Sequence, residues 1–242
     1  MRGRGARLLA LAVPALAALV AGIAVPAGAG SLRIMPIRVE VNADARFCSL
    51  TVTNDEDTPV SVQVRGYGWS KDANNADVLT EDPGFQINPT IVTLAGKQER
   101  LVRCGLPPVT GTGEQTWRLV LDELPQPGPA VGGVRTLLRI SVPVFRAAAE
   151  AQPDLVWSIS TDAQGKPALV IENRGTRHAQ VLSLDLEGAG SGQAPARITR
   201  SFYVLAGGRA EVALPGTLAG TPDSVRATTP DGPLDLRPRA GP

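Results

Sequence analysis

Histidine, cysteine, methionine and aromatic residues are all scarce in this chain of 242 residues. It contains one histidine, two cysteines and two methionines, and aromatic residues make up 4% of it. A catalytic triad would have to be built on His178 alone, and no nucleophile elbow lies near it. Methionine and histidine are too few for a copper carrier. We therefore predict no enzyme activity, no metal site and no cofactor, and we interpret His178 as a surface residue.

The charge balance and the carboxylates exclude further classes of function. The chain has 24 Lys and Arg against 23 Asp and Glu, so no basic excess indicates nucleic acid binding. No Gly-rich loop matches a phosphate cradle between a strand and a helix, and no small-molecule substrate is predicted. Asp122 and Glu123 are neighbours on a strand pattern and point to opposite faces, which favours a salt bridge or turn contact over acid–base chemistry. Trp69, Trp117 and Trp157 are interpreted as core residues rather than a sugar site.

The N-terminal segment has the pattern of a secretory signal peptide. Three arginines precede an apolar run, Leu8–Val25, which ends at Ala27-Gly28-Ala29. A basic start, an apolar middle and small residues at the exit predict cleavage after Ala29, so residues 1–29 form the signal and the mature chain is exported. The alternative is a membrane anchor, since the run has about the minimum of 18 apolar residues for a span.

The predicted export determines the expected redox state of the two cysteines. In an oxidising compartment, one disulfide between Cys48 and Cys104 is the expected state. Closing a loop of this size with a disulfide stabilises the folded state by roughly 4 kcal/mol in the chain-entropy model. The alternative is a pair of buried thiols.

Short alternating strand patterns, separated by turn signals, run through the rest of the chain, and no helical period of useful length interrupts them. This pattern predicts an all-β fold with two antiparallel sandwiches in tandem. We place the first domain at residues 30–146, a hinge at 147–153 and the second domain at 154–242, with residues 235–242 expected to be unordered. The predicted strands are residues 32–41 (broken at Pro36), 47–53, 60–67, 85–94, 99–104, 115–124, 134–144, 155–160, 167–172, 179–186, 200–204 and 209–214. A polar loop is predicted at 70–77.

The strand predicted at residues 134–144 differs from the others. One face is apolar, and the opposite face is charged, with Arg135 and Arg139. Pro143 cannot donate to a sheet ladder, which confines this part of the strand to an edge, a bulge or a strand end. A long apolar edge strand promotes aggregation unless the protein uses it to bind a partner. We therefore predict that this strand binds another protein.

Several stretches together resemble the periplasmic pilus-assembly chaperones of the chaperone–usher system, in particular the archaic, spore-coat-protein-U branch. The likeness runs from about Ser31 to Leu214. The stretches that carry it are Ile34-Met35-Pro36-Ile37-Arg38-Val39, Leu50-Thr51-Val52-Thr53-Asn54-Asp55-Glu56, residues 91–103, Trp117–Pro125, Arg139-Ile140-Ser141-Val142-Pro143-Val144-Phe145 and Tyr203-Val204-Leu205-Ala206-Gly207-Gly208.

The resemblance implies a fold and a function. The fold is two immunoglobulin-like β-sandwich domains set at an angle with a cleft between them. The function is to bind and stabilise pilin subunits by lending them a strand, the mode known as donor-strand complementation, and to deliver them to an outer-membrane usher. The place of action is the periplasm. The implied donor-strand residues are Val134, Thr136, Leu138, Ile140 and Val142.

The resemblance also implies a site for the subunit's C-terminal carboxylate, which family members hold with two basic residues deep in the cleft. Arg38 matches the first by its place in the opening strand, and a guanidinium can grip a carboxylate with two hydrogen bonds. The family's second basic residue corresponds to Val142, so the nearest basic residue, Arg139, is our substitute. The alternative for Arg139 is an ordinary strand-face salt bridge. Cys48 and Cys104 fall on the neighbouring strands B and E of such a sandwich.

Two other functions are compatible with tandem sandwiches. One is a secreted structural or adhesive protein that pairs through its exposed edge strand. The other is a carbohydrate-binding accessory module, which would need a row of exposed aromatic residues that this composition does not favour.

Overall fold

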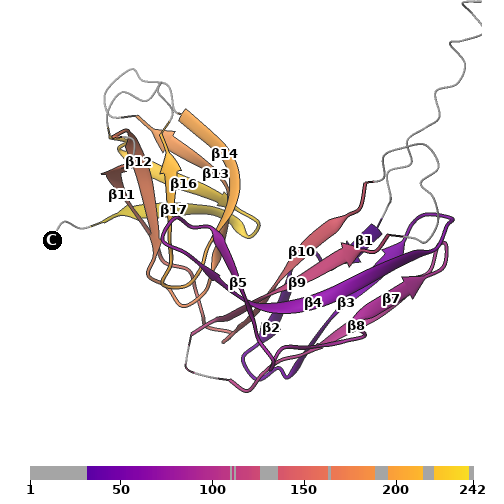
Figure 1. Ribbon diagram of the computed structural model, residues 1–242. Coiled ribbons are helices and arrows are strands. Elements are labelled where there is room, and N and C mark those ends of the chain that lie inside the picture. Colours follow the sequence, from indigo (N-terminus) through magenta and orange to yellow (C-terminus); the bar gives the residue numbers. More distant parts are fainter. Residues whose placement is uncertain are drawn as a thin grey trace, which may run out of the picture.

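The computed structural model describes residues 32–109, 111, 113–125, 136–162, 165–188, 196–214 and 221–239. Within these ranges all helix and strand structure is β-strand, which confirms the all-β prediction. None of these residues belongs to a helix capable of crossing a membrane. Figure 1 shows two lobes set at an angle and joined by a short connector. The predicted signal peptide, residues 1–29, and Val134 lie outside the described residues.

The described residues of the first lobe form ten strands, and all of them except β5 lie close to predicted ones. They are β1 (Leu32–Met35), β2 (Val39–Asn42), β3 (Phe47–Asn54), β4 (Val60–Lys71), β5 (Asp77–Glu81), β6 (Gln86–Asn88), β7 (Ile91–Leu94), β8 (Glu99–Gly105), β9 (Gln115–Glu123) and β10 (Arg139–Ala147). The predicted break at Pro36 is confirmed, since β1 ends before it and β2 begins after it.

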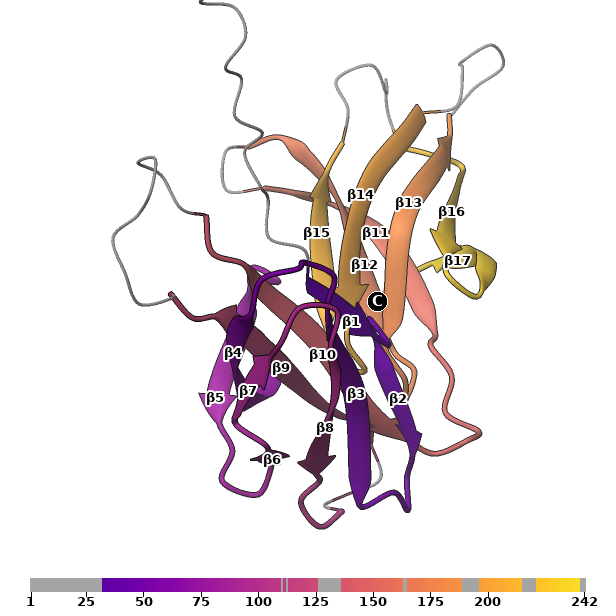
Figure 2. The same ribbon diagram turned by 90° about the vertical axis from the view of Figure 1, so that its right-hand side faces the viewer.

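These strands form two packed sheets. One sheet has the order β1-β3-β8-β6, and the other has the order β2-β10-β9-β4-β5, with β7 also paired to β4. Figure 2 shows the two layers, with β3 and β8 in front of β9 and β10. Because β1 and β2 join different sheets, the chain changes sheet at Pro36. Alternate residues of most of these strands point inward, and their side chains form one apolar core that includes Val62, Leu119 and Val144.

The loop predicted at residues 70–77 is shorter than expected. β4 continues to Lys71 and turns back as β5, so only residues 72–76 form the loop. The Asp72 carboxylate organises this turn by accepting hydrogen bonds from the backbone N–H groups of Asn74 and Ala76. The sequence analysis missed β5 because its residues are exposed on both faces and show no alternation.

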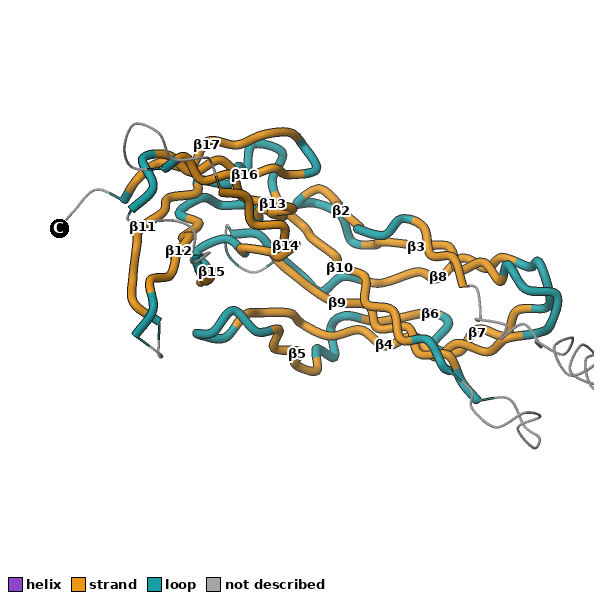
Figure 3. The backbone as a smooth tube through the Cα atoms, turned by 90° about the horizontal axis from the view of Figure 1, so that it is seen from above, coloured by secondary structure: helices purple, strands orange, loops and turns teal. Residues whose placement is uncertain are grey.

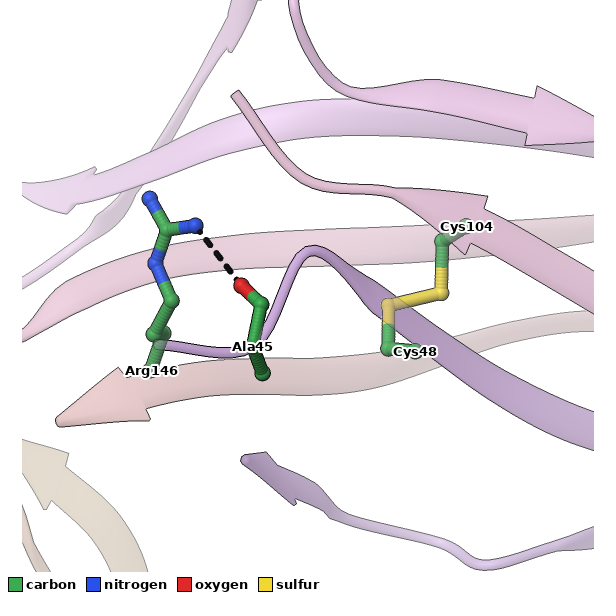
Figure 4. The surroundings of a disulfide bond; sticks show 4 residues. All are labelled: Ala45, Cys48, Cys104 and Arg146. Atoms are coloured by element: carbon green, nitrogen blue, oxygen red, sulfur yellow. Dashed lines mark hydrogen bonds between the residues drawn. A yellow bond between two sulfur atoms is a disulfide. The ribbon is translucent and has the colours of Figure 1, made fainter. Parts of the chain in front are cut away.

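The predicted disulfide is present. Cys48 and Cys104 lie directly opposite each other on β3 and β8, with Cα atoms 4.9 Å apart (Figure 4). Both residues are buried in the core of the first lobe. Beside them, Arg146 donates a hydrogen bond to the carbonyl of Ala45, which ties the end of β10 to the turn before β3 (Figure 4).

The described residues of the second lobe form seven strands that enclose a core of their own. They are β11 (Leu155–Thr161), β12 (Pro167–Asn173), β13 (Ala179–Glu187), β14 (Ala196–Val204), β15 (Arg209–Ala213), β16 (Ser224–Thr229) and β17 (Gly232–Pro238). They follow the order β14-β13-β16-β17-β11-β12-β15, and side chains from all seven meet in one apolar cluster. Seen from above, these strands gather at one end of the molecule, and β10 runs towards them (Figure 3).

The expectation of an unordered tail from Asp235 was wrong for its first residues. β17 extends to Pro238, pairs with β16 and runs parallel to the start of β11. Leu236 is buried in the second core, which holds the strand in place. The abundance of proline and glycine after Leu214 hid β16 and β17 from the sequence analysis.

The disulfide yields a stability prediction. Replacing both Cys48 and Cys104 with alanine should lower the free energy of unfolding by about 2–4 kcal/mol, because the unfolded chain regains the freedom of a loop that spans 56 residues. Urea denaturation measures this change. The matched control is Ser49→Ala with Arg103→Ala, the next opposed pair in the same ladder, which should leave the midpoint close to native. Equal midpoints for the cysteine variant and the native protein would contradict the prediction.

Candidate functional site at the domain junction

The central feature of the site is the uneven pairing of β10. Along one edge, residues Arg139–Arg146 pair with β9. Along the other edge, β2 pairs only with Val144–Ala147. Among the described residues, no strand covers the edge of Arg139–Pro143 that faces away from β9. Unpaired N–H and C=O groups on such an edge form a template for another strand.

The side chains of this segment do not point as the sequence analysis expected. Val142 and Val144 are 2% and 0% exposed and belong to the first lobe's own core, and Ile140 packs against that core. Leu138 is half-buried and Thr136 is exposed. In a sheet that covers a core, one face of each strand packs on that core. In β10 this face carries Ile140, Val142 and Val144. The alternate face presents Leu137, Arg139 and Ser141 to solvent.

Arg139 lies on this exposed face and forms a surface ion pair. Its Nε donates to the carboxylate of Asp122, the residue opposite it on β9, and its side chain is 71% exposed. Arg65 of β4 binds the other oxygen of the same carboxylate. Burial alone raises the pKa of Asp122, but the hydrogen bonds from Arg139 and Arg65 outweigh it and lower the pKa. Asp122 thus forms salt bridges, as the sequence analysis favoured. Arg139 forms the ordinary strand-face salt bridge that was the alternative to its role as a carboxylate anchor.

Arg38 lies in the cleft between the lobes. It follows the turn at Pro36 and immediately precedes β2. Its Nε is 2.7 Å from a carboxylate oxygen of Glu40, and its Nη1 donates to Oε1 of Gln180 in the second lobe at 3.3 Å. Asp231, also from the second lobe, is 4.0 Å away. Arg38 lines a cleft of about 300 Å³ whose other walls come mainly from the second lobe.

A second arginine in this region, Arg118, was not singled out from the sequence. It lies opposite Pro143 on β9, and its side chain is 10% exposed. Its guanidinium carbon is 3.7 Å from the ring centroid of Trp69, and Nη2 is 3.6 Å from Asp77. Within the described part of the chain, Nε of Arg118 has no hydrogen-bond partner. Burial lowers the pKa of Arg118, and Asp77 partly compensates.

The register places Arg38 and Arg118 on either side of Pro143. β2 pairs Val39 with Val144, so Arg38 comes just before that pair, and β9 pairs Arg118 with Pro143. Two strand spacings separate the two backbones, about 10 Å. Arg139 lies five positions before Val144, about 16 Å along the strand. The structure therefore brings Arg38 close to Arg118 rather than to Arg139.

An aromatic cluster holds the two lobes together beside these arginines. Trp69 and Phe145 of the first lobe pack against Tyr203 and Leu205 of the second. The ring of His178 stacks on Phe145 with centroids 3.5 Å apart. Phe145 points away from the core that Val144 enters, so the end of β10 contributes to both lobes.

The interpretation of His178 as a surface residue was wrong. It is 5% exposed, and both its backbone N–H and its Nδ1 lie 2.8 Å from the carboxylate oxygens of Glu114 in the first lobe. The side chain of Glu114 is 1% exposed, so this contact is a buried polar link between the lobes. No sequence pattern indicated this contact, because the two residues are 64 positions apart.

The alternation of β9 was the available signal for Arg118. Leu119 and Leu121 of the predicted strand point inward, which places Arg118 on the outward face. Its proximity to Arg38 depends on the strand order β2-β10-β9, and neither the spacing nor the composition of the sequence contains that order. The sequence therefore identified one of the two cleft arginines.

One protein-family model matches the sequence of the first lobe. Residues 31–150 match the family model described as pili and flagellar-assembly chaperone, PapD N-terminal domain. No curated protein sequence matches the chain.

Solved structures share the fold over both lobes. A chain of the complex between chaperone CsuC and tip adhesion subunit CsuE, from the archaic Csu pili of Acinetobacter baumannii, has a TM-score of 0.70 at 21% identity, covering 87% of this chain and 100% of that one. A chain of the Salmonella enterica SafA pilin–SafB chaperone complex gives 0.62 at 17% identity, covering 87% and 97%. The E. coli chaperone DraB gives 0.59 at 18% identity, covering 86% and 98%.

The carboxylate beside Arg118 yields a prediction on pH. Burial raises the pKa of Asp77, but hydrogen bonds from Lys71 and Trp69 and the charge of Arg118 lower it below its usual 3.8. A lowered pKa in the folded state stabilises the fold above the usual value, and this stabilisation is lost as the pH falls through the folded-state pKa. Asp77→Asn should therefore reduce thermal stability at neutral pH and have a diminishing effect in acid. Melting curves across pH measure this, and a pH-independent difference would contradict it.

Proposed function

We propose that this chain binds pilin subunits in the periplasm and delivers them to an outer-membrane usher. Its residues 31–150 match the PapD N-terminal domain of the pili and flagellar-assembly chaperone family. The observation that carries the proposal is the edge of β10 that no described strand covers, which ends beside Arg38 and Arg118. The activity is binding, and it needs neither a catalytic group nor a cofactor.

The free edge supplies the strand-pairing part of the proposal. A pilin that lacks one strand exposes an apolar groove and unpaired backbone groups. The backbone of Arg139–Pro143, extended by residues 136–138, completes the pilin's ladder by β-strand addition. Leu137, Arg139 and Ser141 face the pilin, since Ile140 and Val142 remain in the chaperone's own core. Of the donor residues expected from the sequence, Ile140 and Val142 thus support the strand from its inner face instead of facing the pilin.

The two cleft arginines supply the anchoring part of the proposal. A C-terminal carboxylate placed beside Pro143 lies between Arg38 and Arg118, which reach it from the strands on either side. Arg118 has an unpaired Nε among the described groups and a low-dielectric surrounding, where a charge-assisted hydrogen bond is strong. We therefore assign the second anchor to Arg118, and we assign Arg139 to the outer, exposed part of the binding edge.

The anchor assignment predicts which arginine variants lose the subunit. Arg38→Gln and Arg118→Gln should each weaken capture of a co-expressed pilin by roughly 2 kcal/mol or more, because a buried carboxylate would lose a charged partner. Arg139→Gln should have a smaller effect, and Arg103→Gln, an exposed arginine of the opposite sheet, should have none. Co-purification of the pilin measures capture, and melting curves identify variants that fail to fold. Loss with Arg139→Gln but not Arg118→Gln would contradict the assignment.

The strand-pairing proposal predicts the effect of a charge on the binding edge. Leu137 is 41% exposed, and Leu137→Asp should abolish subunit capture while leaving the melting temperature unchanged, because a carboxylate would enter the pilin's apolar groove. Leu101→Asp is the matched control, since Leu101 is 47% exposed on β8 in the other sheet. Equal capture by the two variants would count against pairing along β10.

A further inference from the structure

We propose that Tyr203 of the second lobe is a third residue that binds the subunit's C-terminal carboxylate, through its hydroxyl group. This inference rests on the proposed function and extends it, since it makes the carboxylate site a joint product of both lobes.

The position of Tyr203 supports this role. Tyr203 lies near the end of β14 and directly opposite Gln180 of β13, the residue that accepts a hydrogen bond from Arg38. Its ring packs against Trp69 and Phe145, with centroid distances of 5.4 and 5.7 Å. These contacts fix the ring at the junction, so the hydroxyl group has a defined direction rather than a mobile one.

Both cleft arginines surround this tyrosine. The guanidinium carbon of Arg118 is 5.6 Å from the ring centroid, and Arg38 donates a hydrogen bond to Gln180, the residue opposite Tyr203. A protonated phenol can donate one hydrogen bond. Two guanidinium charges therefore lie near a hydrogen-bond donor. An anion is the ligand that this combination suits.

The phenol remains a donor under physiological conditions. Burial raises the pKa of Tyr203, and the charges of Arg38 and Arg118 only partly oppose this effect. The group is therefore protonated at neutral pH. Glu40 is the carboxylate that also acts on Tyr203, but it is already bound to Nε of Arg38 and to Arg177. An incoming carboxylate between Arg38 and Arg118 would meet the free phenol proton.

Tyr203→Phe tests the role of the hydroxyl group, because it removes that group and keeps the ring in the aromatic cluster. The probe is a synthetic peptide of a pilin's C-terminal strand, from the same chaperone–usher gene cluster, prepared as the free acid and as the amide. Calorimetry gives both affinities for the full-length mature protein. Ser201→Ala removes an exposed hydroxyl from the same strand and serves as the matched control.

We expect Tyr203→Phe to bind the acid about ten- to a hundredfold more weakly, the usual loss for a hydrogen bond to a charged group, and to bind the amide as the native protein does. Ser201→Ala should match the native protein with both peptides. If Tyr203→Phe binds the acid normally while Arg38→Gln and Arg118→Gln do not, the anchor stands and the role of Tyr203 is overturned. Equal weakening of both peptides would also overturn it, because packing would then be the cause. A native protein that does not prefer the acid would refute the carboxylate anchor itself.

Discussion

The short parallel pairing between β2 and the last four residues of β10 is the contact on which the rest of the site depends. The chain changes sheet at Pro36, so β2 begins only at Val39 and reaches β10 only at Val144. Among the described strands, none covers the edge of β10 before this point, although β9 supports it fully from the other side. The same change of sheet places Arg38 at the boundary between the paired and open parts. One irregularity in the first strand thus produces both a free edge and a charge at its end.

The junction between the lobes is built from residues that serve both sides. At the end of β10, Val144 enters the first core while Phe145 packs on Trp69, His178 and Tyr203 outside it. The buried pair of Glu114 and His178 adds a polar link with a fixed geometry. Polar contacts of this kind are costly unless fully paired, so they favour one relative position of the lobes over others. This junction places Arg38 and Arg118 of the first lobe beside Gln180 and Tyr203 of the second.

Local alternation was enough to predict most of the strands and the two sandwiches, because both depend on neighbours in sequence. The disulfide was predicted from the expected export of a chain that contains two cysteines. Local alternation failed for β5, whose residues are exposed on both faces, and for β16 and β17, where proline and glycine mask a strand such as Gly232–Pro238. Arg38 was proposed through the family resemblance, by its place in the opening strand. Arg118 and Tyr203 were not, because their meeting requires the order of β2, β10 and β9 and the docking of two lobes, which depend on contacts between distant parts of the chain.

In the proposed complex, the open edge and the arginine pair together set the direction and the register of the bound strand. A chain whose last residue lies beside Pro143 and whose preceding residues follow the edge back to Leu137 must run parallel to β10. The distance is about 20 Å, and it is measured from the partner's terminal carboxylate. Adding or removing one residue at that terminus would turn every side chain of the bound strand to the opposite face. With the proposed anchor, recognition of the chain end and recognition of the alternating pattern become a single requirement, and a strand that ends one residue too early or too late would present the wrong face along its whole length.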